Sequence, residues 1–161
     1  DFEYIGYWDA DCATPLREIN NLIIEIKKQN ALVIFGSRIK RLGSKIKRNK
    51  VRHILGRIAA TLASIISNLE VYDTQCGAKI FNIKVINEAF SKEFFTKWLF
   101  DIEIFLRIKK NYNQDIFYEY PLIEWRDIRG SKISIFDIIK VPIDFIKIIY
   151  FYNFNNINNK S

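Results

Sequence analysis

The stretch that decides the fold reads YIGYWDADCATPL and spans Tyr4 to Leu16. A hydrophobic run ends there on two aspartates, Asp9 and Asp11, separated by one alanine. In an extended chain residues i and i+2 point the same way, so the two carboxylates should face together at the end of a buried strand. Ligands of open α/β sheets bind beyond the carboxyl ends of strands, and two carboxylates suit a hard cation such as Mg²⁺ or Mn²⁺. The pair therefore predicts a metal seat for a phosphorylated ligand, with a plain helix cap as the alternative.

Strands and helices are expected to alternate along the rest of the chain. Apolar runs predict strands over 2–8, 31–35, 78–82 and 115–125. Helical spacing predicts helices from Thr14-Pro15, with Thr14 as the N-cap, and over 54–69, 85–90, 101–110 and 134–152. This order indicates one α/β domain with a largely parallel sheet. Residues 153–161 are polar and of low complexity, which predicts a disordered tail.

The charge of the chain is concentrated in one segment. Nine arginines and lysines lie between Gly36 and Arg57 with no acidic residue among them, whereas the whole chain carries a net charge of +7. Such a segment predicts an anionic partner, either phosphate, lipid headgroup or nucleic acid, or else a solvated basic face. The segment contains no aromatic residue to stack on bases, which argues against nucleic acid.

Several other classes of protein are excluded or disfavoured. The two cysteines, Cys12 and Cys76, are too few for a disulfide scaffold, and both are expected to be reduced, buried packing residues. No apolar run has the length and purity of a membrane-spanning helix. The last predicted helix has a narrow charged stripe on an apolar surface, which predicts either a helix that lies on a membrane or one that packs in a core.

Five blocks in order, DADCATPLREI, FGSR, YDTQCGAKIF, WLFDIEIF and EWRDIRGSK, resemble family 2 glycosyltransferases of the GT-A fold. The group that they resemble most is the dolichyl-phosphate glucosyltransferases and their bacterial polyprenyl-phosphate relatives. The resemblance covers nearly the whole chain. It implies a partial GT-A domain over 1–152 that lacks the amino-terminal nucleotide-binding portion.

The resemblance also implies roles for individual residues. Asp9 and Asp11 would bind Mg²⁺ or Mn²⁺ at the donor diphosphate, and Asp101 and Glu103 would be the catalytic acidic residues. The acceptor-binding candidates are Arg38, Arg48, Arg52, Asp73 and Lys79. The donor-binding candidates are Arg129, Lys132, Trp98 and Gln75. The structural alternatives are a solvated basic face for the arginines, a core position for Trp98, and an i,i+4 pair with Arg107 for Glu103.

The implied function is an inverting, metal-dependent transfer of a sugar from a nucleotide diphosphate sugar to a polyprenyl phosphate. The expected location is the cytoplasmic, inner face of a membrane, where the protein would be peripheral and serve cell envelope glycan biosynthesis. One alternative is a family 2 enzyme that acts on a glycan or another hydroxyl acceptor. The other is a non-catalytic basic module that binds anionic lipid or nucleic acid.

Overall fold

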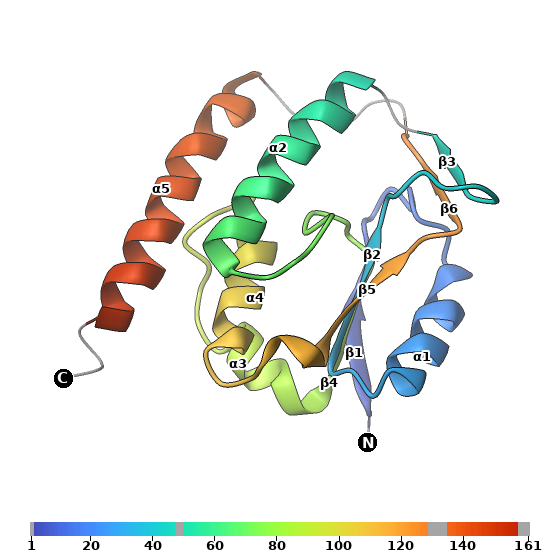
Figure 1. The fold of residues 1–161 in the computed structure, drawn as a ribbon, viewed down its shortest axis with the longest axis horizontal. Helices are drawn as coiled ribbons and strands as arrows, with labels where there is room; N and C mark the ends of the chain where they lie inside the picture. Colours follow the sequence, from blue (N-terminus) through green and yellow to red (C-terminus); the bar gives the residue numbers. More distant parts are fainter. Residues whose placement is uncertain (1, 48–49, 129–134, 158–161) are drawn as a thin grey trace.

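A four-stranded sheet with helices on both faces forms the centre of the molecule (Figure 1). The computed structural model describes the backbone of residues 2–47, 50–128 and 135–157, and the side chains of 2–47, 56–128 and 140–152. In spatial order the strands are β1 (Tyr4–Tyr7), β4 (Lys79–Asn82), β2 (Val33–Ser37) and β5 (Phe117–Pro121).

The sheet is mixed, so the prediction of a largely parallel sheet was only partly right. β1, β2 and β5 run in one direction, but β4 lies between β1 and β2 and is antiparallel to both. The reason lies in the connection that precedes β4. Residues 68–78 return the chain to the edge at which β2 ends, as the contact of Arg38 with Asp73 shows, so β4 must start at that edge.

Alternation along the central strands builds a core on each face of the sheet. Val33, Phe35 and Phe81 belong to the cluster that contacts the helices after β4, whereas Ile34 and Ile80 belong to the cluster on the opposite face. Successive side chains of a strand point to opposite faces, and both faces are apolar here because helices cover both. The aliphatic and aromatic content of these strands follows from that double burial.

The helices form unequal layers on the two faces (Figure 1). α1 (Glu18–Lys28) covers one face alone, through Leu22 and Ile26. α3 (Ile86–Phe90) and α4 (Phe100–Lys109) cover the other face. α2 (Lys50–Ser67) and α5 (Ile135–Ile157) pack outside α4 through a third cluster. Its buried members are Ala63, Leu99, Ile102, Phe145 and Ile148.

Two short strands, which follow β2 and β5 in the chain, form a small second sheet. β3 (Lys45–Lys47) lies inside the basic segment, where only a loop was predicted, and pairs in parallel with β6 (Glu124–Arg126). The single strand predicted over 115–125 is therefore two strands, β5 and β6, which are separated by Leu122 and Ile123. Two 3-10 helices, η1 (Ile83–Val85) and η2 (Gln114–Ile116), complete the described elements.

The start of the first helix and the end of the last helix differ from the boundaries predicted from the sequence. Thr14 does not cap a helix, and α1 begins only at Glu18. The carbonyl oxygen of Thr14 instead accepts a hydrogen bond of 2.7 Å from Trp8 Nε1, and a turn from Pro15 leads into the helix. At the other end α5 continues to Ile157 with Pro142 inside it, so residues 153–157 are helical rather than part of a tail.

Candidate functional site

Polar and charged side chains gather at one edge of the sheet, where β1 and β2 end and β4 begins. The register explains the meeting, because Lys79 at the start of β4 pairs with both Tyr7 of β1 and Phe35 of β2. The segments that follow β1 and β2 and precede β4 therefore converge, together with the first turn of α4. Five candidate residues lie at this edge: Asp9, Arg38, Asp73, Lys79 and Asp101.

Asp9 lies directly against Gly77. A Cβ atom built on Gly77 would lie 2.0 Å from Asp9 Oδ1 and 2.3 Å from Oδ2, so only glycine leaves room for this carboxylate. Although the residue is exposed on one side, the surrounding protein removes water from the carboxylate and raises its pKa above the ordinary value, and the charge of Asp11 adds to this. Lys79 and Arg38 act in the opposite direction. A bound cation would relieve this unfavourable charge.

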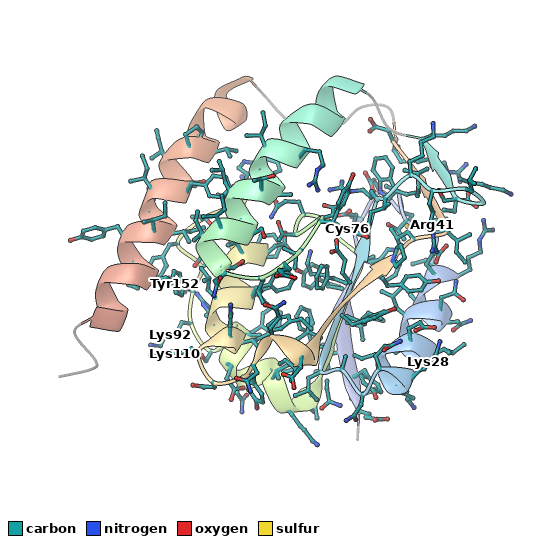
Figure 2. The ribbon with its side chains drawn as sticks, in the orientation of Figure 1. Lys28, Arg41, Cys76, Lys92, Lys110 and Tyr152 are labelled. Atoms are coloured by element: carbon teal, nitrogen blue, oxygen red, sulfur yellow. The ribbon has the colours of Figure 1, made fainter. Side chains whose placement is uncertain are left out.

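Asp11 belongs to a tight turn that follows β1. Its Oδ1 accepts a hydrogen bond of 2.9 Å from Ala13 N–H, and Cys12 N–H donates to the Asp9 carbonyl at 2.9 Å. Cys12 has a φ of 51° and is exposed, so the expectation that it is buried was wrong. Its place in the turn directs it outward, whereas Cys76, labelled in Figure 2, is buried as expected and burial raises the pKa of its thiol to about 11.

The carboxylates at this edge fit a Mg²⁺ site completed by water and substrate better than a metal site formed by protein side chains alone. Among the residues that the structure describes, no group of three or more His, Cys, Asp and Glu side chains is arranged to hold a metal. Mg²⁺ is commonly bound by one or two carboxylates, with waters and substrate phosphates completing its six ligands. Asp9 and Asp11 could supply that share, because Asp11 uses only Oδ1 in its turn.

Arg38 and Asp73 form a buried, two-pronged ion pair. Arg38 Nε lies 2.6 Å from Asp73 Oδ2, and Nη2 lies 2.7 Å from Oδ1. The guanidinium also lies 5.4 Å from the ring centroid of Trp125, and the side chains of Arg38 and Asp73 are only 14% and 6% exposed. Glu119 of β5 supports the pair, since its carboxylate accepts hydrogen bonds of 2.7 Å from the backbone N–H groups of Tyr72 and Asp73. The two acceptor-binding candidates thus bind each other, which fixes the guanidinium in place.

Lys79 and Asp101 form a second buried ion pair. Lys79 Nζ lies 2.6 Å from Asp101 Oδ1 and donates a hydrogen bond of 2.5 Å to the Cys76 carbonyl oxygen. Lys79 is 0% exposed, although the sequence suggested that it contacts the acceptor. Tyr7 OH also donates to Asp101 Oδ1. Asp101 sits in the first turn of α4 and keeps a small exposed surface.

Glu103, the other catalytic candidate, is enclosed by the protein. Its carboxylate accepts hydrogen bonds from Thr96 N–H at 2.8 Å, Thr96 Oγ1 at 2.7 Å and Phe95 N–H at 3.1 Å. Tyr152 OH lies 3.3 Å from it, and Arg107 Nη2 lies at 3.5 Å in the i,i+4 arrangement that the sequence offered as the alternative. These contacts tie α4 to the segment before it and to α5.

The remaining candidates are only partly described. Gln75 Nε2 is buried and has no hydrogen-bond partner within the described part of the chain. Trp98 is half-buried. The backbone of Arg52 lies in α2 but its side chain is outside the described residues, and so are Arg48, Arg129 and Lys132 entirely.

Three residues of this edge were not found from the sequence. Tyr7 and Trp125 looked like ordinary apolar strand residues, and nothing in the local pattern points to their polar or cation contacts. Glu119 did carry a signal, because it is an acidic residue between two tyrosines in a strand that is otherwise apolar. Buried acidic residues need hydrogen-bond donors, and that need could have predicted its contact with a neighbouring backbone segment.

The curated proteins that the chain matches all carry the same name, dolichyl-phosphate beta-glucosyltransferase. No family model matches the chain. It is 33% identical over 155 residues to dolichyl-phosphate beta-glucosyltransferase ALG5D of Trichomonas vaginalis, covering 91% of this chain and 46% of that protein. It is 34% identical over 154 residues to ALG5A of the same organism, covering 93% and 46%. It is 32% identical over 158 residues to dolichyl-phosphate beta-glucosyltransferase of Saccharomyces cerevisiae, covering 89% and 46%.

The matches cover 89–93% of this chain, yet the chain spans about half the length of the curated relatives it matches. The sheet flanked by helices is compatible with part of a GT-A-like domain. The chain is therefore a homologue of the dolichyl-phosphate beta-glucosyltransferases, a group of the family 2 glycosyltransferases.

Proposed function

We propose that the chain is part of a glycosyltransferase, and that this enzyme transfers a sugar from a nucleotide diphosphate sugar to a polyprenyl phosphate. The observation that carries this proposal is the meeting of Asp9, the Arg38–Asp73 pair and the Lys79–Asp101 pair at one sheet edge in a homologue of enzymes named for dolichyl phosphate. Acidic side chains that can bind a metal ion lie beside basic side chains that can bind phosphate. This combination suits a reaction between two phosphorylated substrates.

In the proposed reaction a phosphate oxygen of the acceptor attacks the anomeric carbon from the face opposite the leaving group. The new C–O bond forms as the bond to the nucleoside diphosphate breaks, which inverts the anomeric centre and releases the nucleoside diphosphate. A phosphate monoester has its second pKa near ~6, so at neutral pH the acceptor is already largely a dianion and needs little help from a base. Mg²⁺ or Mn²⁺ at Asp9 and Asp11 would neutralise charge on the leaving diphosphate.

The chain's own residues would then mainly bind and orient the substrates. Arg38, with Arg48 and Arg52 of the basic segment, is proposed to attract the acceptor phosphate. Asp73 holds the Arg38 guanidinium through Nε and Nη2, which leaves Nη1 with no partner among the described residues. Arg129, Lys132, Trp98 and Gln75 are proposed to contact the donor.

A transfer assay with the complete gene product tests the proposal. We expect a glycosylated polyprenyl phosphate, detected by mass spectrometry, when the protein is given nucleotide diphosphate sugars and a polyprenyl phosphate. Asp101→Asn should lower this transfer about ten- to hundredfold and not abolish it, because the acceptor is already ionised. Loss of all transfer in Asp101→Asn, or transfer only to glycan or lipid hydroxyl groups, would favour the hydroxyl-acceptor enzyme instead.

The proposed lipid acceptor requires contact with a membrane surface, and α5 offers an apolar face for it. Within the described residues no helix is both long enough and apolar enough to cross a bilayer. α5 instead buries Phe145 and Ile148 against the protein and leaves Ile143, Ile146 and Tyr150 exposed at 51%, 66% and 67%. Figure 1 shows α5 as the outermost helix on its side of the molecule. We propose that this face lies on the cytoplasmic surface of the membrane.

Vesicle binding tests the membrane contact. The double substitution Ile146→Asp and Tyr150→Asp should reduce co-sedimentation with anionic vesicles about tenfold or more, since burial of one large apolar side chain contributes about 1.5–3 kcal/mol. Ile24→Asp is the matched control, because Ile24 is 63% exposed but lies on α1, across the sheet from α5 (Figure 1). Equal losses in both variants would mean that the α5 face makes no special contact with the bilayer.

A further inference from the structure

Three side chains form a buried polar cluster at the sheet edge: Tyr7, Lys79 and Asp101. Two polar contacts end on the same atom, Asp101 Oδ1, which accepts a hydrogen bond from Tyr7 OH and lies 2.6 Å from Lys79 Nζ. Lys79 Nζ also lies 5.5 Å from the centroid of the Tyr7 ring. Lys79 itself is 0% exposed and can reach no ligand in this structure. Its charge therefore acts on other protein groups.

The fold explains how these residues come together. β4 is the only antiparallel strand of the four-stranded sheet, so its first residue, Lys79, lies level with Tyr7 at the end of β1. The Tyr7 ring is held between Phe81 and Phe100, with centroid distances of 5.9 Å and 5.8 Å. The Tyr7 hydroxyl and the Lys79 ammonium thus reach the first turn of α4 from two neighbouring strands.

The two carboxylates of the first turn of α4 differ in how fully they are used. Both oxygens of Glu103 have partners, Oε1 with Thr96 and Oε2 with Phe95, Arg107 and Tyr152. Asp101 has its partners on Oδ1 alone, and no described residue donates a hydrogen bond to Oδ2. Its side chain also keeps 9% of its surface exposed, whereas that of Glu103 keeps 0%. Asp101 thus has one oxygen left for a ligand.

The chemistry of a carboxylate limits what that ligand can be. An ionised carboxylate only accepts hydrogen bonds, and so do the donor diphosphate and the acceptor phosphate when ionised. At the reacting centre, between the two phosphorylated groups, the hydroxyl groups of the transferred sugar are therefore the suitable partners for Asp101 Oδ2. A hydrogen bond between a hydroxyl and a charged carboxylate is among the stronger ones in proteins.

We propose that Tyr7 and Lys79 are positioning residues that hold Asp101 Oδ1, so that Oδ2 accepts a hydrogen bond from a hydroxyl group of the transferred sugar. The proposal rests on the proposed function, and it gives Lys79 a role other than binding of the acceptor. It also makes Asp101 a determinant of which sugar is transferred. Asp101 is fixed by its neighbours in advance, so the hydrogen bond loses little to reorganisation when substrate arrives.

Tyr7→Phe is the variant that tests the proposal, because it removes one hydroxyl and keeps the ring between Phe81 and Phe100. In the complete gene product we expect kcat to fall about tenfold, the effect of one lost hydrogen bond to a charged group, with KM for polyprenyl phosphate unchanged. Lys79→Met should lower kcat at least as much. Monodeoxy donor sugars give a second readout: with the analogue that lacks the bound hydroxyl, wild type and Tyr7→Phe should react at the same rate.

Tyr152→Phe is the matched control, because Tyr152 OH contacts the other carboxylate of the same helix turn, that of Glu103. This control should lower the melting temperature and leave kcat unchanged. If Tyr7→Phe likewise lowers only the melting temperature, or if no deoxy donor removes its effect, the positioning role is overturned while the proposed function stands. A wild-type protein that transfers no sugar would overturn the proposed function, and the positioning role with it.

Discussion

Replacing Asp9 with asparagine is expected to lower sugar transfer about a thousandfold and to weaken Mn²⁺ binding by at least about tenfold. Stabilisation of charge by a metal in the transition state amounts to several kcal/mol, and each 1.36 kcal/mol is tenfold in rate. Asp9 stands at the end of β1, where its carboxylate is partly desolvated and close to Asp11. It is therefore the group whose charge a cation would neutralise most directly.

Gly77→Ala should reproduce much of this loss of metal binding and transfer, although it leaves the Asp9 carboxylate chemically unchanged. The new Cβ would lie 2.0 Å from Asp9 Oδ1, so the Asp9 side chain must move away from its position. The raised pKa of Asp9 adds a pH dependence. A carboxylate must be ionised to bind metal, so metal binding should weaken as pH falls, starting at a higher pH than for an ordinary aspartate.

The measurement is a titration of Mn²⁺ in the presence of a nucleotide diphosphate, with transfer assayed in parallel. Asp115→Asn is the control, because Asp115 is exposed on η2, next to the start of β5 and so at the opposite end of the strands. This variant should behave as wild type. Equal Mn²⁺ affinity in wild type and Asp9→Asn would contradict the metal seat.

Replacing Asp73 with alanine is expected to lower the free energy of unfolding by about 3–5 kcal/mol, because it leaves a buried arginine without its counter-ion. Arg38 would lose two charge-assisted hydrogen bonds, of 2.6 Å and 2.7 Å, while its guanidinium stays enclosed beside Trp125. The pair also joins the end of β2 to the segment before β4, so that segment should become less ordered. Transfer should fall as well, since Arg38 would no longer be held at the site.

Urea unfolding of both proteins at neutral pH measures this effect. Glu25→Ala is the comparison, because it breaks an ion pair of 3.2 Å with Lys28 on the surface of α1, where such pairs contribute little to stability. A loss for Asp73→Ala as small as that for Glu25→Ala would mean that Arg38 finds water or another partner, and that the pair does not order this edge.

The main elements of the fold were predictable from local pattern because each buries a face whose period shows in the sequence. Val33–Ser37 and Lys79–Asn82 are short runs buried on both faces, and Phe100–Lys109 follows helical spacing. β3 was missed because its alternation is only three residues long and its outer residues are lysines. The cap at Thr14 was mispredicted because α1 begins only at Glu18, after a turn in which the Thr14 carbonyl accepts a hydrogen bond from Trp8, six residues earlier.

Strand direction could not be predicted from any one strand. A strand reads the same whether its neighbour is parallel or antiparallel, because both arrangements bury alternate residues in the same way. Only the course of residues 68–78, fixed by contacts such as Arg38 with Asp73, makes β4 antiparallel. The error in sheet type therefore follows from a long-range contact.

The sequence by itself was enough to identify the residues that could carry the chemistry of the site, and the family that they resemble. The Asp-x-Asp pair at a strand end, the basic segment and the five ordered blocks are local features, and the similarity to dolichyl-phosphate beta-glucosyltransferases agrees with them. Tertiary structure alone decided what each of these residues contacts. It pairs Arg38 with Asp73, buries Lys79 beneath Asp101, encloses Glu103 and sets Gly77 against Asp9. The physical reason is that a charged side chain looks the same in sequence whether it faces solvent or a buried partner. Only the fold brings together residues such as Tyr7 and Asp101, 94 positions apart, and so determines which charges remain free for a ligand.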